Sequence, residues 1–134
     1  MEINYIAIII ASLIVFFVWM LWYSEILFGG LWIKEMGISL KDAKKEQSGM
    51  RKMLVIQFIT TVATTYILAY LLVMLQITEM RPALQLAFWI WFGFLAMPGI
   101  TAMLWDKRSL TLTLINQSHF LLNLIIATLV LVSM

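Results

Sequence analysis

Cysteine is absent from these 134 residues, and only one histidine and two prolines are present. The absence of cysteine excludes disulfides, thiolate metal sites and catalysis by a thiol. A single histidine excludes haem ligation by two histidines of one chain. No catalytic, metal-binding or nucleotide-binding motif stands out in the sequence. We therefore expect no cofactor and no metal, and no enzymatic activity can be assigned.

Charged side chains are also scarce, at 12% of the chain, and they are confined to Glu2 and three short stretches. The four uncharged runs between them cover residues 3–24, 53–78, 82–105 and 109–134. Each run exceeds the roughly 20 apolar residues that span the ~30 Å hydrocarbon core of a bilayer. With 63% hydrophobic residues the chain lies far outside the composition of soluble domains, so it is predicted to cross a membrane four times.

The predicted fold class is all-α, an integral membrane bundle of four transmembrane helices. Lipid offers no hydrogen-bond partners to the backbone, so only helices or closed β-barrels span a membrane. These long runs do not alternate between apolar and polar residues as barrel strands do. The expected spans cover about residues 3–24, 53–77, 83–105 and 110–133. The loop 25–52 is expected to hold a short amphipathic segment at the membrane surface. One such bundle uses residues 1–134 as a single domain.

The distribution of lysine and arginine predicts the orientation. Eight of the nine basic residues lie in the first and third connections, and Arg81 alone lies on the opposite side. Because basic residues concentrate in cytoplasmic loops, both termini are expected outside the cytoplasm of an inner (cell) membrane. Such a strong asymmetry also argues against insertion in both orientations.

Polar residues recur on one face of the second span and on one face of the fourth. They are Gln57, Thr60, Thr61 and Thr64 in the second span, and Asn116, His119 and Asn123 in the fourth. Both helices start from the cytoplasmic side, so the two stripes are expected at similar depths. The third span is expected to kink near that depth, because Pro98 cannot donate to the carbonyl of Phe94. These residues form the candidate pocket.

His119 is the only ionisable residue well inside a span, which makes it a candidate functional residue. A pKa near neutrality suits a proton relay. The alternative is that a neutral His119 bonds one neighbour and holds helices together, at roughly 1 kcal/mol or less. The threonines have a similar alternative, since each can bond the carbonyl four residues back. No acid lies inside a span, which argues against proton antiport driven by a carboxylate.

Aromatic residues mark the end of the first span and the surface segment. Trp22 and Tyr23 are typical of a headgroup boundary. Glu25 beside them is expected to cap the helix or pair with a loop lysine. Trp32 and Lys34 belong to the short amphipathic stretch. This group is the candidate surface for a partner.

Three segments resemble a family of four-span membrane proteins known as domain of unknown function 1761. Asn4-Tyr5 opens the first span, and WYSEILFGGLWIKEMG (Trp22 to Gly37) is similar to that family's Trp-Tyr signature and the surface segment after it. LWDKRSLTLTLINQSHFLL (Leu104 to Leu122) resembles its Leu-Phe-x-Gly-Arg-Ser turn and the helix that follows. Asp106-Lys107 stand where the family pattern has a glycine, and Gly30 precedes Leu31-Trp32 instead of a lysine. The resemblance implies a fold and no activity.

Two functions remain open at this point. The first is a non-enzymatic protein that oligomerises and binds or conducts a small solute, ion or lipid at the candidate pocket. The second is a structural or assembly protein that docks a partner through its cytoplasmic loop. The expected partners are the lipid bilayer, further copies of the chain and a possible membrane-protein partner, and no nucleic acid.

Overall fold

The computed structural model describes residues 2–24, 27–36 and 50–134. Within them it contains helices and no strand. The order is α1 (Tyr5–Trp22), α2 (Gly29–Met36), α4 (Met50–Met74), α5 (Met80–Ile90), η2 (Trp91–Ala96), α6 (Met97–Trp105) and α7 (Leu110–Ser133). Four stretches of this part are long and apolar enough to cross a membrane: Tyr5–Trp22, Arg51–Met74, Met80–Trp105 and Leu110–Ser133. The all-α fold class is confirmed, and the chain is a multi-pass membrane protein.

Side-chain caps fix the starts of α1 and α7. The Asn4 Oδ1 accepts the Ala7 N–H at 3.0 Å, and the Ser109 Oγ accepts the Leu112 N–H at 3.0 Å. Each cap satisfies a backbone donor that the first helical turn leaves unpaired. Both capping residues belong to the segments that carry the family resemblance, so the caps give those motifs a structural reason.

The turn from α4 to α5 closes α4 with a Schellman motif. Gln76 takes the left-handed conformation at φ 56°, while the Ile77 N–H donates to the Leu72 carbonyl at 2.9 Å. Ile77 also packs against the hydrophobic core that contains Leu72. The turn from α6 to α7 also contains a left-handed residue, Lys107 at φ 55°.

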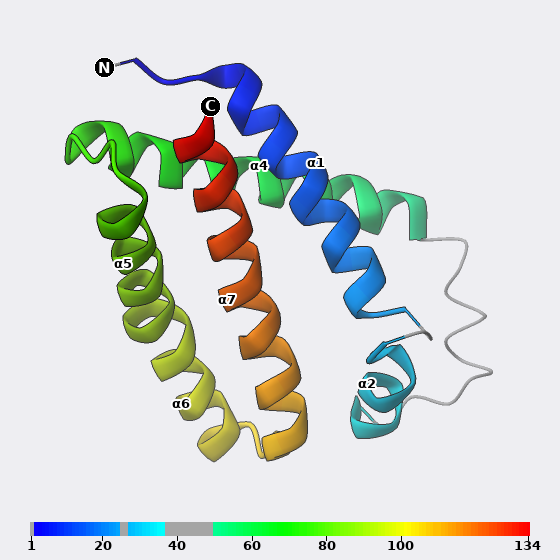
Figure 1. The fold of residues 1–134 in the computed structure, drawn as a ribbon. Helices are drawn as coiled ribbons and strands as arrows, with labels where there is room; N and C mark the ends of the chain where they lie inside the picture. Colours follow the sequence, from blue (N-terminus) through cyan, green and yellow to red (C-terminus); the bar gives the residue numbers. More distant parts are fainter. Residues whose placement is uncertain (1, 25–26, 37–49) are drawn as a thin grey trace.

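Helix α7 is the centre of the bundle. It packs against α1 on one side and against α5 and η2 on the other, with α2 and α6 at its first half. Figure 1 shows this arrangement, with α4 crossing behind α1. Helix α4 contacts α1 far more than α7. The bundle is therefore organised around the fourth span.

The two ends of the bundle differ in what they carry. The terminal end holds Asn4, Met134 and the turn at residues 75–79, and the Asn4 Nδ2 donates to the Met134 carbonyl at 3.5 Å. The loop end holds Trp22, α2 and the turn at residues 106–109 (Figure 1). The apolar core lies toward the terminal end and consists of Val15, Leu68, Leu72, Ala83, Ala87, Leu124 and Ala127.

Small residues allow α7 to approach its neighbours closely. Ala7 and Ala11 of α1 have no exposed surface, and neither do Ala83 and Ala87 of α5. Each pair is spaced four residues apart, which puts both methyl groups on one helix face. Small residues at this spacing are typical of helix contacts in membranes, where van der Waals packing drives association.

The expected break at Pro98 takes the form of the π-helical segment η2. The Met97 N–H donates to the Phe92 carbonyl, five residues back, and α6 then begins with Pro98 in its first turn. A π turn places one more residue in the helix and changes which faces precede and follow it. The rod from α5 to α6 thus follows α7 over its length (Figure 1).

The surface segment is a helix that begins earlier than its glycines suggest. Gly29 and Gly30 form the first turn of α2 instead of separating two segments. A Cβ on Gly29 would collide with the Tyr23 carbonyl, so only glycine fits there, whereas Gly30 has open space around it. The close approach places α2 directly against the end of α1.

Candidate functional site around His119

His119 is buried in an aromatic enclosure at the loop end of the bundle. Its side chain is 2% exposed. The Tyr23 ring meets the imidazole edge-on, with their centroids 5.2 Å apart. The ring centroids of Trp22 and Phe120 lie 6.1 Å and 5.9 Å from that of His119. The enclosure combines the last turn of α1 with the middle of α7. A polar ring is therefore held away from lipid on three sides by aromatic side chains.

Two hydrogen bonds fasten the end of α1 to α7 beside this ring. The Trp22 Nε1 donates to the Ile115 carbonyl at 3.1 Å, and the Tyr23 hydroxyl donates to the Asn116 Oδ1 at 2.7 Å. Trp32 of α2 meets the Tyr23 ring edge-on at 5.9 Å. The two aromatics expected at a headgroup boundary thus bind the fourth helix, and α2 adds a second layer.

Three polar atoms of α7 are buried without a partner among the described residues. They are the Nδ1 of His119, the Oδ1 of Asn123 and the Oε1 of Gln117. The Asn123 Nδ2 lies 3.0 Å from the His119 Nε2. Because an amide nitrogen can only donate, Nε2 accepts and the ring proton lies on Nδ1. The site therefore offers one unpaired donor from His119 and one unpaired acceptor from Asn123.

The polar residues of α4 are not part of this enclosure. The hydroxyls of Thr60 and Thr61 bond the Gln57 carbonyl at 2.8 Å, and Thr64 bonds the Thr60 carbonyl at 2.9 Å. Thr60 and Thr64 are exposed, Gln57 is half-buried and Thr61 is buried. Thr64 instead borders an open apolar groove of about 320 Å³ with Ile90 and Leu124. The structure joins the polar stripe of α7 to the end of α1, and it does not bring the threonines of α4 to His119.

The residue after Pro98, Gly99, makes a separate contact on another side of α7. The neighbouring Gly99 faces the Gln117 side chain so closely that a Cβ there would collide with its amide. The Trp91 Nε1 donates to the Gln117 carbonyl at 2.9 Å. Gln117 and His119 point about 200° apart at 100° per residue, so the two sites face different neighbours. Pro98 itself is exposed.

The candidate partner surface is described only in part. Glu25, with its expected capping or pairing role, and residues 37–49 lie outside the described residues. Lys34 is exposed and Trp32 is half-buried. In the described ranges, no group of three or more His, Cys, Asp or Glu side chains is placed to hold a metal ion.

Sequence reasoning missed two features of the packing around α7. The alanine pairs Ala7/Ala11 and Ala83/Ala87 set the approach of α1 and α5 to α7, and their four-residue spacing was a readable signal. The contact of Gln117 with Gly99 had no such signal, because it depends on which faces of α6 and α7 meet.

The comparisons with known proteins agree with the resemblance in the motifs. A family model described as protein of unknown function (DUF1761) matches residues 6–132. No curated protein and no solved structure gives a significant match to the chain. The family match covers all four spans and the site around His119.

Proposed function

This chain belongs to the DUF1761 family of proteins of unknown function, and we propose from its geometry a non-enzymatic role in the membrane. In this proposal the protein forms homo-oligomers and binds or conducts a small solute, ion or lipid at the site around His119. The proposed location is the inner (cell) membrane with the loop end in the cytoplasm. Supporting this orientation, eight of the nine basic residues fall in the two connections at that end.

The observation that carries the proposal is the pair of unpaired polar atoms beside the aromatic side chains that surround His119. A buried donor or acceptor left without a partner costs about 1–3 kcal/mol. The His119 Nδ1 proton and the Asn123 Oδ1 are both in this condition among the described residues. A ligand group that accepts from the His119 Nδ1 removes one of these costs, and one that donates to the Asn123 Oδ1 removes the other. This chemistry favours a neutral polar group over a bare cation, which the Nδ1 proton would repel.

No enzymatic activity is proposed, because the spans offer no cysteine and no carboxylate beside His119 that could activate a nucleophile. The aromatic rings instead supply an apolar, rigid wall. Pockets for small molecules typically combine such walls with a few placed polar groups. The arrangement therefore suits recognition and holding of a ligand.

The test is native mass spectrometry of the full chain ejected from its own membrane. We expect a reproducible small-molecule mass on the unmodified protein, and a loss of about tenfold or more in its occupancy for His119→Phe. The Phe ring keeps the aromatic packing and removes only the polar atoms. Thr128→Val is the matched control, since Thr128 is equally buried on α7 but bonds its own helix at the Leu124 carbonyl.

Two outcomes would contradict the ligand site. One is an unmodified protein that carries no small molecule while remaining folded. The other is His119→Phe that retains the ligand as well as Thr128→Val does. Either result leaves His119 as a residue that holds α1 and α7 together.

The second candidate is docking of a membrane-protein partner through the loop end. The supporting observation is that α2 is held on the bundle by Trp32 while Leu31, 40% exposed, and Lys34 face outward. In this case Leu31→Ser with Lys34→Glu should abolish co-purification of the partner and leave the ligand mass unchanged. Partner recovery that survives both substitutions would rule out this role for α2.

A further inference from the structure

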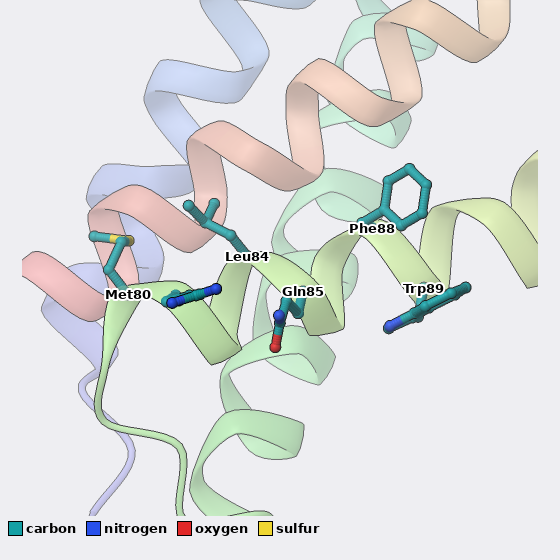
Figure 2. Close-up of a pocket in the computed structure, with 6 residues that line it drawn as sticks. Met80, Leu84, Gln85, Phe88 and Trp89 are labelled. Carbon is teal, nitrogen blue, oxygen red and sulfur yellow. The ribbon is translucent and has the colours of Figure 1, made fainter.

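The outer face of α5 carries a line of exposed polar side chains that runs from the end of the helix into the membrane span. Arg81, Gln85 and Trp89 are all exposed and recur every four residues, so they form one line along the helix. They border a shallow groove of about 630 Å³ whose lining comes from α5 alone. Figure 2 shows Gln85 and Trp89 projecting from the same side of the helix. The described bundle thus supplies only one wall of this groove.

The line continues into η2 with a backbone acceptor. Gly93 is four residues beyond Trp89, is exposed, and has open space where a Cβ would be. Its carbonyl would normally accept from Met97, but that N–H donates to Phe92. The next candidate donor is Pro98, which has no N–H. The π-helical segment therefore leaves the Gly93 carbonyl without a donor from its own helix.

Depth decides what can satisfy these groups. At 1.5 Å per residue, Gln85 lies about 7.5 Å and Gly93 about 20 Å beyond Met80. Within a ~30 Å hydrocarbon core, Gly93 is beyond the reach of lipid headgroups and lipid tails offer no hydrogen bond. The described residues provide no side-chain hydrogen bond to Gln85 or Trp89 either. A second transmembrane helix is the partner that can reach the whole line.

The face is complementary to itself. An amide such as Gln85 both donates and accepts, so it can pair with the same residue of a second copy. The Trp89 indole is a donor and the Gly93 carbonyl is an acceptor. Glu79 and Arg81 are both exposed, two residues apart at the terminal end, and supply one charge of each sign. A two-fold interface requires that each group find its partner within the same patch, and this patch meets that requirement.

We propose that the face formed by Arg81, Gln85, Trp89 and Gly93 is where a second copy of this chain docks, around a two-fold axis normal to the membrane. This interface gives the homo-oligomer of the proposed function its location, and it rests on that function only in assuming that copies associate. It uses no residue of the site around His119. Gly93 has the role of admitting the partner helix close to the backbone.

The test is disulfide cross-linking of the full chain in native membranes. Because the chain has no native cysteine, any disulfide must involve the introduced thiol. Phe88→Cys places a thiol on the groove and keeps all four residues of the polar line. Tyr70→Cys on α4 is the control, because Tyr70 is 47% exposed and Phe88 is 44% exposed. We expect a dimer band for Phe88→Cys under mild oxidation and none for Tyr70→Cys.

A second variant tests the polar line itself. Adding Gln85→Leu to Phe88→Cys should lower the cross-linked fraction about three- to tenfold, and Gln85→Asn should retain most of it. Three results would overturn the proposal. The first is cross-linking that is equal at both thiols or absent at both. The second is an adduct whose mass is that of another protein. The third is a monomer that holds a phospholipid, which Gln85→Leu releases.

The two proposals fail separately. A dimer lost in Gln85→Leu with the small-molecule mass still present supports the interface. If instead the dimer persists through His119→Phe and no ligand is ever found, the interface stands and the ligand site falls.

Discussion

At the scale of single residues, Lys107 holds a conformation that suits glycine. Its φ of 55° lies in the left-handed region, which costs a residue with a Cβ roughly 1–2 kcal/mol. We expect Lys107→Gly to raise the free energy of unfolding by about 1 kcal/mol, since glycine adopts this region freely. The measurement is thermal or denaturant unfolding of the purified protein in detergent.

The control is Lys107→Ala, which removes the same charge but keeps a Cβ and should give no gain. Gln76→Gly offers an independent case, because Gln76 has φ 56° in the turn after α4. Equal stability of Lys107→Gly and Lys107→Ala would contradict the backbone explanation.

At the scale of elements, the contact between α6 and α7 depends on Gly99. We expect Gly99→Ala to destabilise the bundle by about 1–3 kcal/mol, because the added Cβ collides with the Gln117 amide. The cost should disappear in a Gln117→Ala background, where the methyl group has room. Unfolding of the four proteins in a double-mutant cycle measures this coupling.

Gly30→Ala in α2 is the matched control, since its Cβ would meet open space. It should be neutral or gain up to about 1 kcal/mol from better helix propensity. If Gly99→Ala costs the same with and without Gln117, then the loss arises in α6 itself and the packing explanation is wrong.

The positions of the spans were predictable, whereas the pairing of their faces was not. A bilayer demands a long uncharged run for every crossing, so the charges alone placed the four helices. The face of α4 with Thr60 and Thr64 was predicted to meet His119, but those hydroxyls bond their own helix and α4 packs mainly on α1. Because a threonine can satisfy its hydroxyl on a carbonyl of its own helix, its position in the sequence does not indicate which neighbouring helix it faces.

The site around His119 was predictable in its residues and not in its partners. Asn116, His119 and Asn123 lie on one helix face, as their spacing indicated. Their neighbours Trp22 and Tyr23 sit at a helix end, where aromatic residues are common for reasons of lipid chemistry alone. The hydrogen bonds to α7 arise from the way α1 lies across it, which no local pattern reveals.

At the scale of the whole molecule, the charge asymmetry predicts one orientation. We expect alkaline phosphatase fused after Met134 to be active and a fluorescent protein fused there to stay dark, because the terminal end should lie outside the cytoplasm. A fusion in the turn at residues 106–109 serves as the reverse control and should show the opposite pattern. Bright fluorescence of the Met134 fusion would contradict the proposed topology and indicate the opposite orientation.

The central place of α7 also has a consequence for biosynthesis. Helices α1, α2 and α5 all pack against α7, which the ribosome delivers after the other three spans. Until α7 is inserted, Ala83 and Ala87 of the core lack Leu124 and Ala127, and the indole and phenol at the end of α1 lack their acceptors. We therefore expect the packing of the bundle to be completed only after α7 has entered the membrane.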